Sequence, residues 1–329
     1  MGRRSLSFLA LLAAALLIAF FWLQREPQPV ATAQEPLLPM LQGKFNEVSA
    51  IEIQRPGQPL VRLARKDGVW VVPAKSDYPA AGQPLAELLR ALSEARKVEA
   101  KTRNPEFHGR LGVAEQGKED EQATRVTLER GTGEPVRLLI GKAAPQGRGQ
   151  MVRLAGDPQV WLVNQSIEMP ANELAWLDRR VTVIPFGDIR EFDLRHAGGE
   201  QLTLFRESKD EPNLKVRQMP QGQRLAYEAV ANGMVMPLSR LDFAEAAPLA
   251  QVQFKGKPEL EFTLATFAGG RLKGAVYAQG GEHWLTLPER EGLSEAEVPA
   301  KADWTYRLEP YQYQAMAKKL KDLLPEKTP

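Results

Sequence analysis

The chain begins with a run of 19 uncharged and mostly apolar residues, Ser5 to Leu23, directly after Arg3 and Arg4. A helix of about 20 apolar residues spans the hydrocarbon core of a bilayer, and basic residues at one end keep that end in the cytoplasm. We therefore expect a single-pass membrane anchor with a cytoplasmic N-terminus. Everything after Leu23 is then expected on the opposite side of the membrane.

A cleaved signal peptide is the alternative interpretation of this segment. Ala31-Thr32-Ala33 has the small-x-small pattern of a cleavage site. Cleavage normally takes place within a few residues of the apolar run, whereas nine residues separate Leu23 from Ala33. This spacing favours a retained anchor and leaves cleavage at Ala33 as the open alternative.

Composition limits what the rest of the chain can do. Lysine and arginine number 43, and aspartate and glutamate number 41, so the formal net charge is only +2 and provides no strong field to attract nucleic acid. The absence of cysteine excludes disulfides, thiol catalysis and cysteine-bound zinc. A length of about 290 residues after the anchor and a proline-rich linker suits two domains of ordinary size.

Short alternating runs separated by turns dominate the pattern after the linker. Ile51 and Ile53 alternate with polar residues, and Asp67-Gly68 joins two further alternating runs. An Asp-Gly pair in this context indicates a hairpin turn. Over residues 84–97, four leucines recur at the spacing of one helical face. These signals predict a three-stranded meander followed by a helix.

The second half of the chain repeats this order of elements. The segment 188–194 resembles 48–53, and Pro237 to Leu241 is expected to open a second helix as Pro84 opens the first. Trp176-x-x-Arg179 returns as Trp304-x-x-Arg307.

We therefore expect an α+β protein with an N-terminal transmembrane helix followed by two tandem β-rich repeats, each a mostly antiparallel sheet with one main helix. A last amphipathic helix is expected over 313–324. The expected limits are a cytoplasmic tip and anchor at 1–25, a proline-rich linker at 26–43, the repeats at 44–180 and 181–310, and a C-terminal helix and tail at 311–329.

The chain also resembles the bacterial domain-of-unknown-function family numbered forty-three-forty over most of its length, from about Lys44 to Pro288. This resemblance implies one N-terminal membrane helix, a large extracytoplasmic region and a gene position beside an ABC-type transporter of the gliding-motility kind. It implies no activity and no functional residues. The segments that carry it are Ile51-Glu52-Ile53, Lys66-Asp67-Gly68-Val69-Trp70, the leucine helix after Tyr78-Pro79-Ala80, Leu139-Ile140-Gly141-Lys142 and Trp176-Leu177-Asp178-Arg179.

No group of residues has the spacing of a catalytic, cofactor or metal site. His108, His196 and His283 are the only histidines and lie far apart, and the acidic run 119–121 fits a solvated loop. Neither a nucleophile elbow nor a phosphate-binding loop occurs. We expect no catalytic residues, no cofactor, no metal and no nucleic-acid partner.

Trp176, Arg179, Trp304 and Arg307 are the candidate partner-contact residues. Tryptophan and arginine are enriched among the residues that contribute most to protein interfaces. In the alternative interpretation, each tryptophan closes the core of its own repeat and each arginine covers an edge of that core.

The function expected from these observations is a non-enzymatic binding or scaffold protein, accessory to an ABC-type transport system. It is expected in the bacterial inner membrane with the bulk of its chain in the periplasm. The expected partners are a transporter permease or auxiliary protein, and the membrane itself through Ser5 to Leu23. The alternative is a cell-envelope hydrolase or glycan-binding protein.

Overall fold

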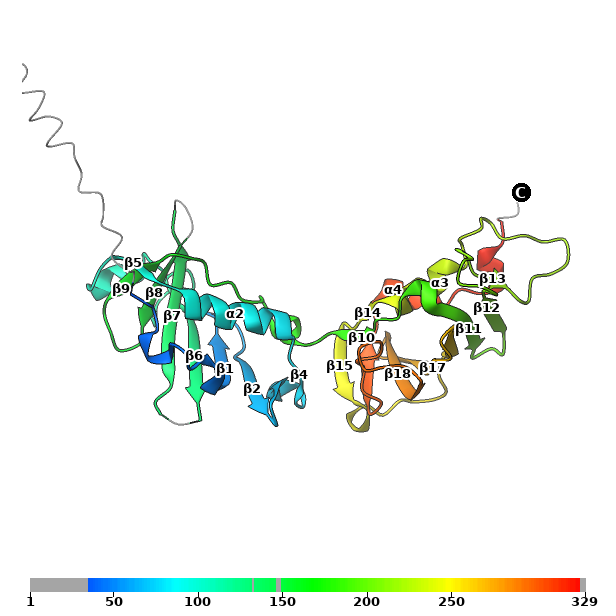
Figure 1. Cartoon of the computed structure of the whole chain (residues 1–329), viewed down its shortest axis with the longest axis horizontal. Helices are drawn as coiled ribbons and strands as arrows, with labels where there is room; N and C mark the ends of the chain where they lie inside the picture. Colours follow the sequence, from blue (N-terminus) through cyan, green and yellow to red (C-terminus); the bar gives the residue numbers. More distant parts are fainter. Residues whose placement is uncertain (1–34, 132, 146–148, 326–329) are drawn as a thin grey trace, which may run out of the picture. The chain divides into compact units, whose positions relative to one another are not determined.

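The computed structural model describes residues 35–131, 133–145 and 149–325. The predicted span Ser5 to Leu23 and the cleavage position at Ala33 lie outside these residues. In the described part, none of the helices combines the length and the apolar character needed to cross a membrane. This part contains two large antiparallel sheets and three α-helices, which confirms the expected β-rich fold with helices (Figure 1).

The described residues pack as two compact units. The smaller unit comprises 35–46, 90–123 and 138–167, and the larger unit comprises 47–89, 124–137 and 168–325. The first sheet has strands in both units, whereas the second sheet belongs entirely to the larger unit.

The first sheet has nine strands in the order β4-β3-β2-β1-β6-β7-β8-β9-β5. Alternation along β1 turns Ile51 and Ile53 into the core and leaves Glu52 and Gln54 partly exposed. The strands are β1 (Val48–Gln54), β2 (Val61–Lys66), β3 (Val69–Val72), β4 (Tyr78–Pro79), β5 (Lys97–Ala100), β6 (Thr124–Arg130), β7 (Val136–Ala143), β8 (Gln150–Leu154) and β9 (Val160–Val163).

The predicted hairpin is confirmed, and a helix does occupy most of the range predicted at 84–97, but it begins at Gly82 and ends at Glu94, and Lys97 belongs to β5. Asp67 and Gly68 have positive φ angles of 50° and 82° in the turn between β2 and β3, a conformation that aspartate and glycine tolerate better than other residues. Helix α2 (Gly82–Glu94) buries three of its four leucines, namely Leu85, Leu88 and Leu92.

The second sheet has eight strands in the order β13-β12-β11-β16-β17-β18-β19-β15. A separate two-stranded pair joins β10 and β14. The elements are β10 (Arg180–Thr182), β11 (Ile189–His196), β12 (Gln201–Phe205), β13 (Lys215–Val216), α3 (Asn232–Ser239), β14 (Leu241–Asp242), β15 (Glu245–Pro248), β16 (Leu260–Thr266), β17 (Arg271–Gln279), β18 (Glu282–Glu291), β19 (Trp304–Arg307) and α4 (Pro310–Met316).

The two sheets share one strand order. Strands β1, β2 and β3 correspond to β11, β12 and β13, strands β6 to β9 correspond to β16 to β19, and β5 and β15 each pair with the last strand. Ile51 and Phe192 hold equivalent positions, because each lies opposite a leucine on both neighbouring strands. A register shift also interrupts the pairing near the start of both strands, at 48–50 in β1 and 189–191 in β11.

The start predicted for the second helix is wrong. Helix α3 begins at Asn232, contains Pro237 near its C-terminal end and stops before Leu241, which belongs to β14. Proline favours the first helical turn because it lacks a backbone N–H. In α3 the burial of Met234 and Leu238 fixes the helix instead, and Pro237 removes only one intrahelical hydrogen bond.

The C-terminal helix also differs from its prediction. Helix α4 ends at Met316, and a separate 3-10 helix follows at Leu320–Leu323. Gln312 accepts a hydrogen bond of 2.8 Å from the backbone N–H of Glu309, which fixes the start of α4. Met316 and Leu323 are both buried, so two short helices place apolar residues in the core where the periodicity predicted one continuous helix.

Residues assigned to the linker by their proline content are partly folded. The backbone N–H of Leu37 donates to the carbonyl of Ala95 at 2.8 Å, and that of Lys97 donates to the carbonyl of Glu35 at 2.9 Å. The side chains of Leu37, Leu38 and Leu41 are buried. The smaller unit therefore includes the chain from Glu35 onward.

Candidate functional site

Trp176 and Arg179 both contact other residues of the chain in the structure. Trp176 ends the 3-10 helix Glu173–Trp176 and has no exposed surface. The Nε atom of Arg179 donates to the carbonyl of Phe243 at 2.7 Å. Trp176 is therefore a core residue, whereas Arg179 contacts a residue of the second predicted repeat and not the core of its own.

Trp304 and Arg307 lie on strand β19, not on a 3-10 helix, so the two W-x-x-R motifs do not occupy equivalent elements. The Trp304 ring packs edge to face on Tyr78, with 4.7 Å between the ring centroids. Arg307 forms an ion pair with Glu282 at 2.8 Å. A role for these residues in partner contact stays a prediction.

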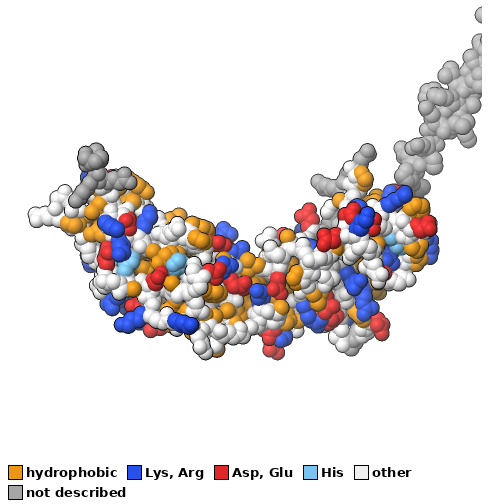
Figure 2. Space-filling model, turned by 180° about the vertical axis from the view of Figure 1, so that it is seen from behind, with side chains coloured by type: hydrophobic (Ala, Val, Ile, Leu, Met, Phe, Trp, Pro, Cys, Tyr) orange, Lys and Arg blue, Asp and Glu red, His pale blue; other side chains and the backbone are white. Residues whose placement is uncertain are grey.

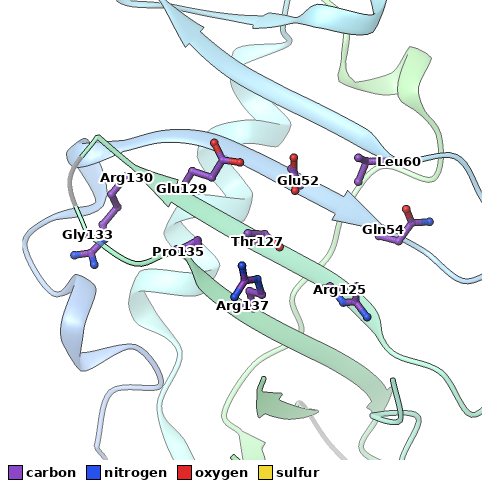
Figure 3. A pocket seen from close by; sticks show the side chains of 10 residues that line it. All are labelled: Glu52, Gln54, Leu60, Arg125, Thr127, Glu129, Arg130, Gly133, Pro135 and Arg137. Carbon is purple, nitrogen blue, oxygen red and sulfur yellow. The ribbon is translucent and has the colours of Figure 1, made fainter. Parts of the chain in front are cut away.

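A hollow of about 530 Å³ lies on the solvent-facing side of the first sheet, within the larger unit (Figure 3). Figure 3 shows Glu52, Thr127 and Arg137 following one another across strands β1, β6 and β7. We call this feature the arginine hollow, because three of its lining side chains are arginines. It is lined by Glu52, Gln54, Leu60, Arg125, Thr127, Glu129, Arg130, Gly133, Pro135 and Arg137.

The two carboxylates of the arginine hollow are held by one guanidinium. Arg62 on β2 donates two parallel hydrogen bonds of 2.9 Å to Glu129 and a further one to Glu52. Hydrogen bonding to Glu129 is the main cause that raises the pKa of Arg62. A bidentate arginine-carboxylate pair is a strong and directional contact, so both carboxylates are held in place and Arg62 compensates one of their two negative charges.

The remaining cations of the arginine hollow lack such partners. Within the described ranges, Arg125 and Arg137 have no hydrogen bond or ion pair to the chain, and both are exposed. Arg130 donates from Nη2 to the carbonyl of Glu134 at 3.2 Å, but its buried Nε has no acceptor among the described residues. The hollow therefore combines two carboxylates that share one guanidinium with further guanidinium groups that are available to an outside acceptor.

Charge over the rest of the surface is mixed. Figure 2 shows acidic and basic side chains interspersed on the face that it displays, in agreement with the formal net charge of +2. Local groups of unpaired charge, and not a long-range field, therefore determine what this surface attracts.

The second sheet carries a hollow of about 460 Å³ in the corresponding place. Asp193 accepts a hydrogen bond of 2.7 Å from Thr203, and Lys273 pairs with Glu289 at 2.5 Å. Asp193 and Lys273 therefore each have a partner within the polar row that runs across these strands. In register order it consists of Thr203, Asp193, Thr263, Lys273 and Glu289.

The histidines lie in separate environments. His108 bonds through Nε2 to the carbonyl of Pro158 at 3.0 Å, and His196 is buried on β11. His283 stacks on Tyr313 with ring centroids 3.4 Å apart. Over the ranges that the structure covers, no three His, Asp or Glu side chains are grouped so as to hold a metal ion.

Sequence reasoning missed Arg125 and Arg137. The sequence does contain a signal, since Arg125, Thr127 and Glu129 alternate with the apolar Val126 and Leu128 and so share the outer face of β6. The sequence does not show which strands lie on either side of β6, and that placement creates the hollow.

Comparison with known proteins supports the resemblance in the sequence. The family described as Domain of unknown function (DUF4340) matches residues 70–276. Neither a curated protein nor a solved structure gives a match. Because the matched segment covers more than half of the 329 residues, the chain belongs to the DUF4340 family.

Proposed function

We propose that this protein is a non-enzymatic binding or scaffold protein of the bacterial periplasm, anchored in the inner membrane and accessory to an ABC-type transport system. The observation that carries the binding role is the arginine hollow, where Arg125 and Arg137 have no internal acceptor while Arg62 holds the two carboxylates. Such a site is suited to contact another molecule, because its free donors gain partners only on binding.

The anchor in this proposal is the uncharged run Ser5 to Leu23, oriented with its N-terminus in the cytoplasm by Arg3 and Arg4. A tethered domain meets its membrane partners at a high effective concentration, so a modest affinity is sufficient. The proposed partner is a transporter permease or an auxiliary protein of the same transporter.

We further propose that the soluble part consists of two tandem repeats, at about 44–180 and 181–310, each with its own antiparallel sheet and main helix. The shared order of eight strands and the register shift at equivalent places in β1 and β11 support a duplication.

Crosslinking of the full chain in membranes, followed by solubilisation in mild detergent and purification, tests the scaffold role. We expect a permease or auxiliary subunit to copurify with the wild type and with Lys273→Gln, a substitution on the second sheet. Removal of Ser5 to Leu23, with export by a cleavable signal, is expected to reduce the yield strongly. Full complementation of a deletion strain by that untethered form, at native expression level, contradicts the anchor requirement.

Reporter fusions test the proposed location separately. A C-terminal alkaline phosphatase fusion is expected to be active, and a C-terminal cytoplasmic fluorescent reporter is expected to be dark. The reverse pattern excludes a periplasmic location. Release of the folded part without detergent identifies Ala33 as a cleavage site instead.

The alternative function is a cell-envelope hydrolase or glycan-binding protein. Glu52 and Glu129 favour it, because two carboxylates that face one hollow are the groups that glycoside hydrolysis requires. Incubation of purified protein with cell-wall glycan decides between the two functions. Turnover that Glu52→Gln or Glu129→Gln abolishes without a change in melting temperature establishes the hydrolase and excludes the non-enzymatic proposal.

A further inference from the structure

We propose that the arginine hollow binds an acidic group, a carboxylate or a phosphate, carried by a small soluble molecule, and that Arg125 and Arg137 contact this group. This inference rests on the proposed binding function and specifies the chemistry of its ligand. It also assigns different roles to the two sheets, because the hollow on the second sheet is expected to bind no such group.

The charges around the hollow favour an anion over a cation. The only lining carboxylates, Glu52 and Glu129, already accept hydrogen bonds from Arg62. A cation would have to compete with that guanidinium for both carboxylates. Arg125 and Arg137 offer planar groups of N–H donors whose geometry matches the oxygens of a carboxylate or phosphate.

The position of the donors within the sheet favours binding to a common group. Thr127 lies opposite Glu52 in the pairing of β1 with β6, and Arg125 lies opposite Gln54 two residues along the same strand. Figure 3 shows Arg137 on β7, so that Thr127 on β6 lies between Arg137 and Glu52 on β1. Side chains two residues apart on a strand share one face, so Arg125 lies beside Thr127 along β6, and Arg137 lies next to Thr127 on the neighbouring strand β7 (Figure 3).

The size of the hollow fits a small molecule. Its volume of about 530 Å³ lies within the roughly 300–1,000 Å³ typical of small-molecule sites. Leu60 and Pro135 add apolar surface to its lining, so a ligand with an acidic group and a short apolar part would meet a basic and an apolar surface in the same hollow. The hydrogen-bonded strands below the hollow keep the arginine backbones in place before binding.

The hollow on the second sheet provides a matched contrast inside the same molecule. It has the same place in the strand order, but Lys273 is paired with Glu289 and Asp193 with Thr203. An anion at Lys273 would have to displace Glu289. The one arginine of this lining, Arg195, donates to the side-chain oxygen of Gln201 from Nε at 3.2 Å and from Nη2 at 3.0 Å. The difference between the two hollows therefore lies in charge pairing and not in backbone architecture.

Calorimetric titration of the full chain in a nonionic detergent tests this inference. The probes are inorganic phosphate and glutarate, each added as its sodium salt at low ionic strength, with choline chloride as the cation control. We expect at least one anion to bind the wild type and choline to give no signal. The double variant Arg125→Gln/Arg137→Gln is expected to bind that anion at least about tenfold more weakly.

Two further variants separate charge from structure. Lys273→Gln, on the second sheet, is expected to leave the affinity for the anion within about twofold of the wild type. Arg125→Lys/Arg137→Lys keeps both charges but loses the planar donor groups, so its affinity is expected to lie between those of the wild type and the glutamine variant. Melting temperatures of all variants show whether each one is folded.

The inference is overturned if neither anion binds the wild type, or if the folded glutamine variant binds as tightly as the wild type. It is equally overturned if Lys273→Gln causes the larger loss. Copurification of a transporter subunit with a wild type that binds neither anion rejects this inference and leaves the proposed function standing. Anion binding with no copurifying subunit rejects the scaffold role and leaves this inference standing.

Discussion

Glu52 on β1 and Asp193 on β11 hold the same register position in their two sheets. Each carboxylate lies opposite a threonine on the next strand, Thr127 for Glu52 and Thr263 for Asp193. On the other side, Glu52 meets the charged Arg62, whereas Asp193 meets the neutral Thr203. One backbone arrangement therefore supports two different charge networks.

Arg62→Ala is expected to lower the free energy of unfolding by about 1 kcal/mol, because the loss of Arg62 leaves Glu52 and Glu129 without their shared cation. The side chains are about one-third exposed, so the effect is expected to shrink as salt is added. Urea unfolding at low and high salt measures both quantities. Lys66→Ala, which removes the more exposed pair with Asp77 at 2.6 Å, is the control and should cost less. A salt-independent loss in Arg62→Ala contradicts the electrostatic explanation.

Alkaline pH is expected to destabilise the fold partly through Tyr306. Burial raises the pKa of this phenol from 10.0 to about 12, so the folded state favours the neutral form. The stabilisation is therefore complete below pH 10 and is lost as the pH rises toward 12.

Tyr306→Phe removes this titrating group, and the free energy of unfolding of the variant should fall less steeply than that of the wild type between pH 10 and 12. A residual slope is expected, because burial also raises the pKa of Tyr78. Urea unfolding at several pH values checks this. Parallel curves for the two proteins refute the role of Tyr306.

Trp176→Ala is expected to lower the free energy of unfolding by about 3–5 kcal/mol, because it removes a large side chain with no exposed surface and leaves a cavity. Trp304→Ala should behave similarly, since only 4% of Trp304 is exposed. Tyr311→Ala, at a residue with 67% of its surface exposed, is the control and should stay within about 0.5 kcal/mol. Weaker partner binding with unchanged stability in Trp176→Ala would instead show an interface role.

Gly274→Ala is expected to destabilise the second sheet by about 1–3 kcal/mol, because a Cβ atom at this position would lie 2.2 Å from the ring of Phe262. Gly233→Ala in α3 meets no atom within 4 Å and should be neutral or slightly stabilising. Denaturant midpoints compare the two variants.

A double-mutant cycle with Phe262→Leu shows whether the clash is the cause. The combined cost of Gly274→Ala and Phe262→Leu should be smaller than the sum of the single costs. Additive costs would show that contact with Phe262 is not the reason why Gly274→Ala lowers stability.

The sequence predicts the fold best where local chemistry and burial agree. Asp67-Gly68 requires a turn for conformational reasons, and the leucines of α2 have only one helical face to bury. Pro237 shows the limit of such signals. Proline marks the first turn of many helices, but the packing of Met234 and Leu238 decided where α3 begins.

The candidate site is less visible in the sequence than the fold. Arg125 and Arg137 are both ordinary polar residues on the outer face of a strand, and a single arginine at such a position does not indicate a site. The site exists because β1 pairs with β6 and because Arg62 on β2 binds both Glu52 and Glu129. The pairing of β1 with β6 and the contact of Arg62 with Glu129 join segments more than 60 residues apart.

The burial of Leu37, Leu38 and Leu41 limits how many residues can lie between a membrane anchor and the fold. If the proposed anchor ends at Leu23, only the residues 24–34 separate the bilayer from chain that is fixed in the fold. Even fully extended, 11 residues reach no more than about 40 Å. In the proposed anchored form, the entry point of the fold at Glu35 therefore stays within that distance of the lipid surface, which favours partners in or beside the membrane.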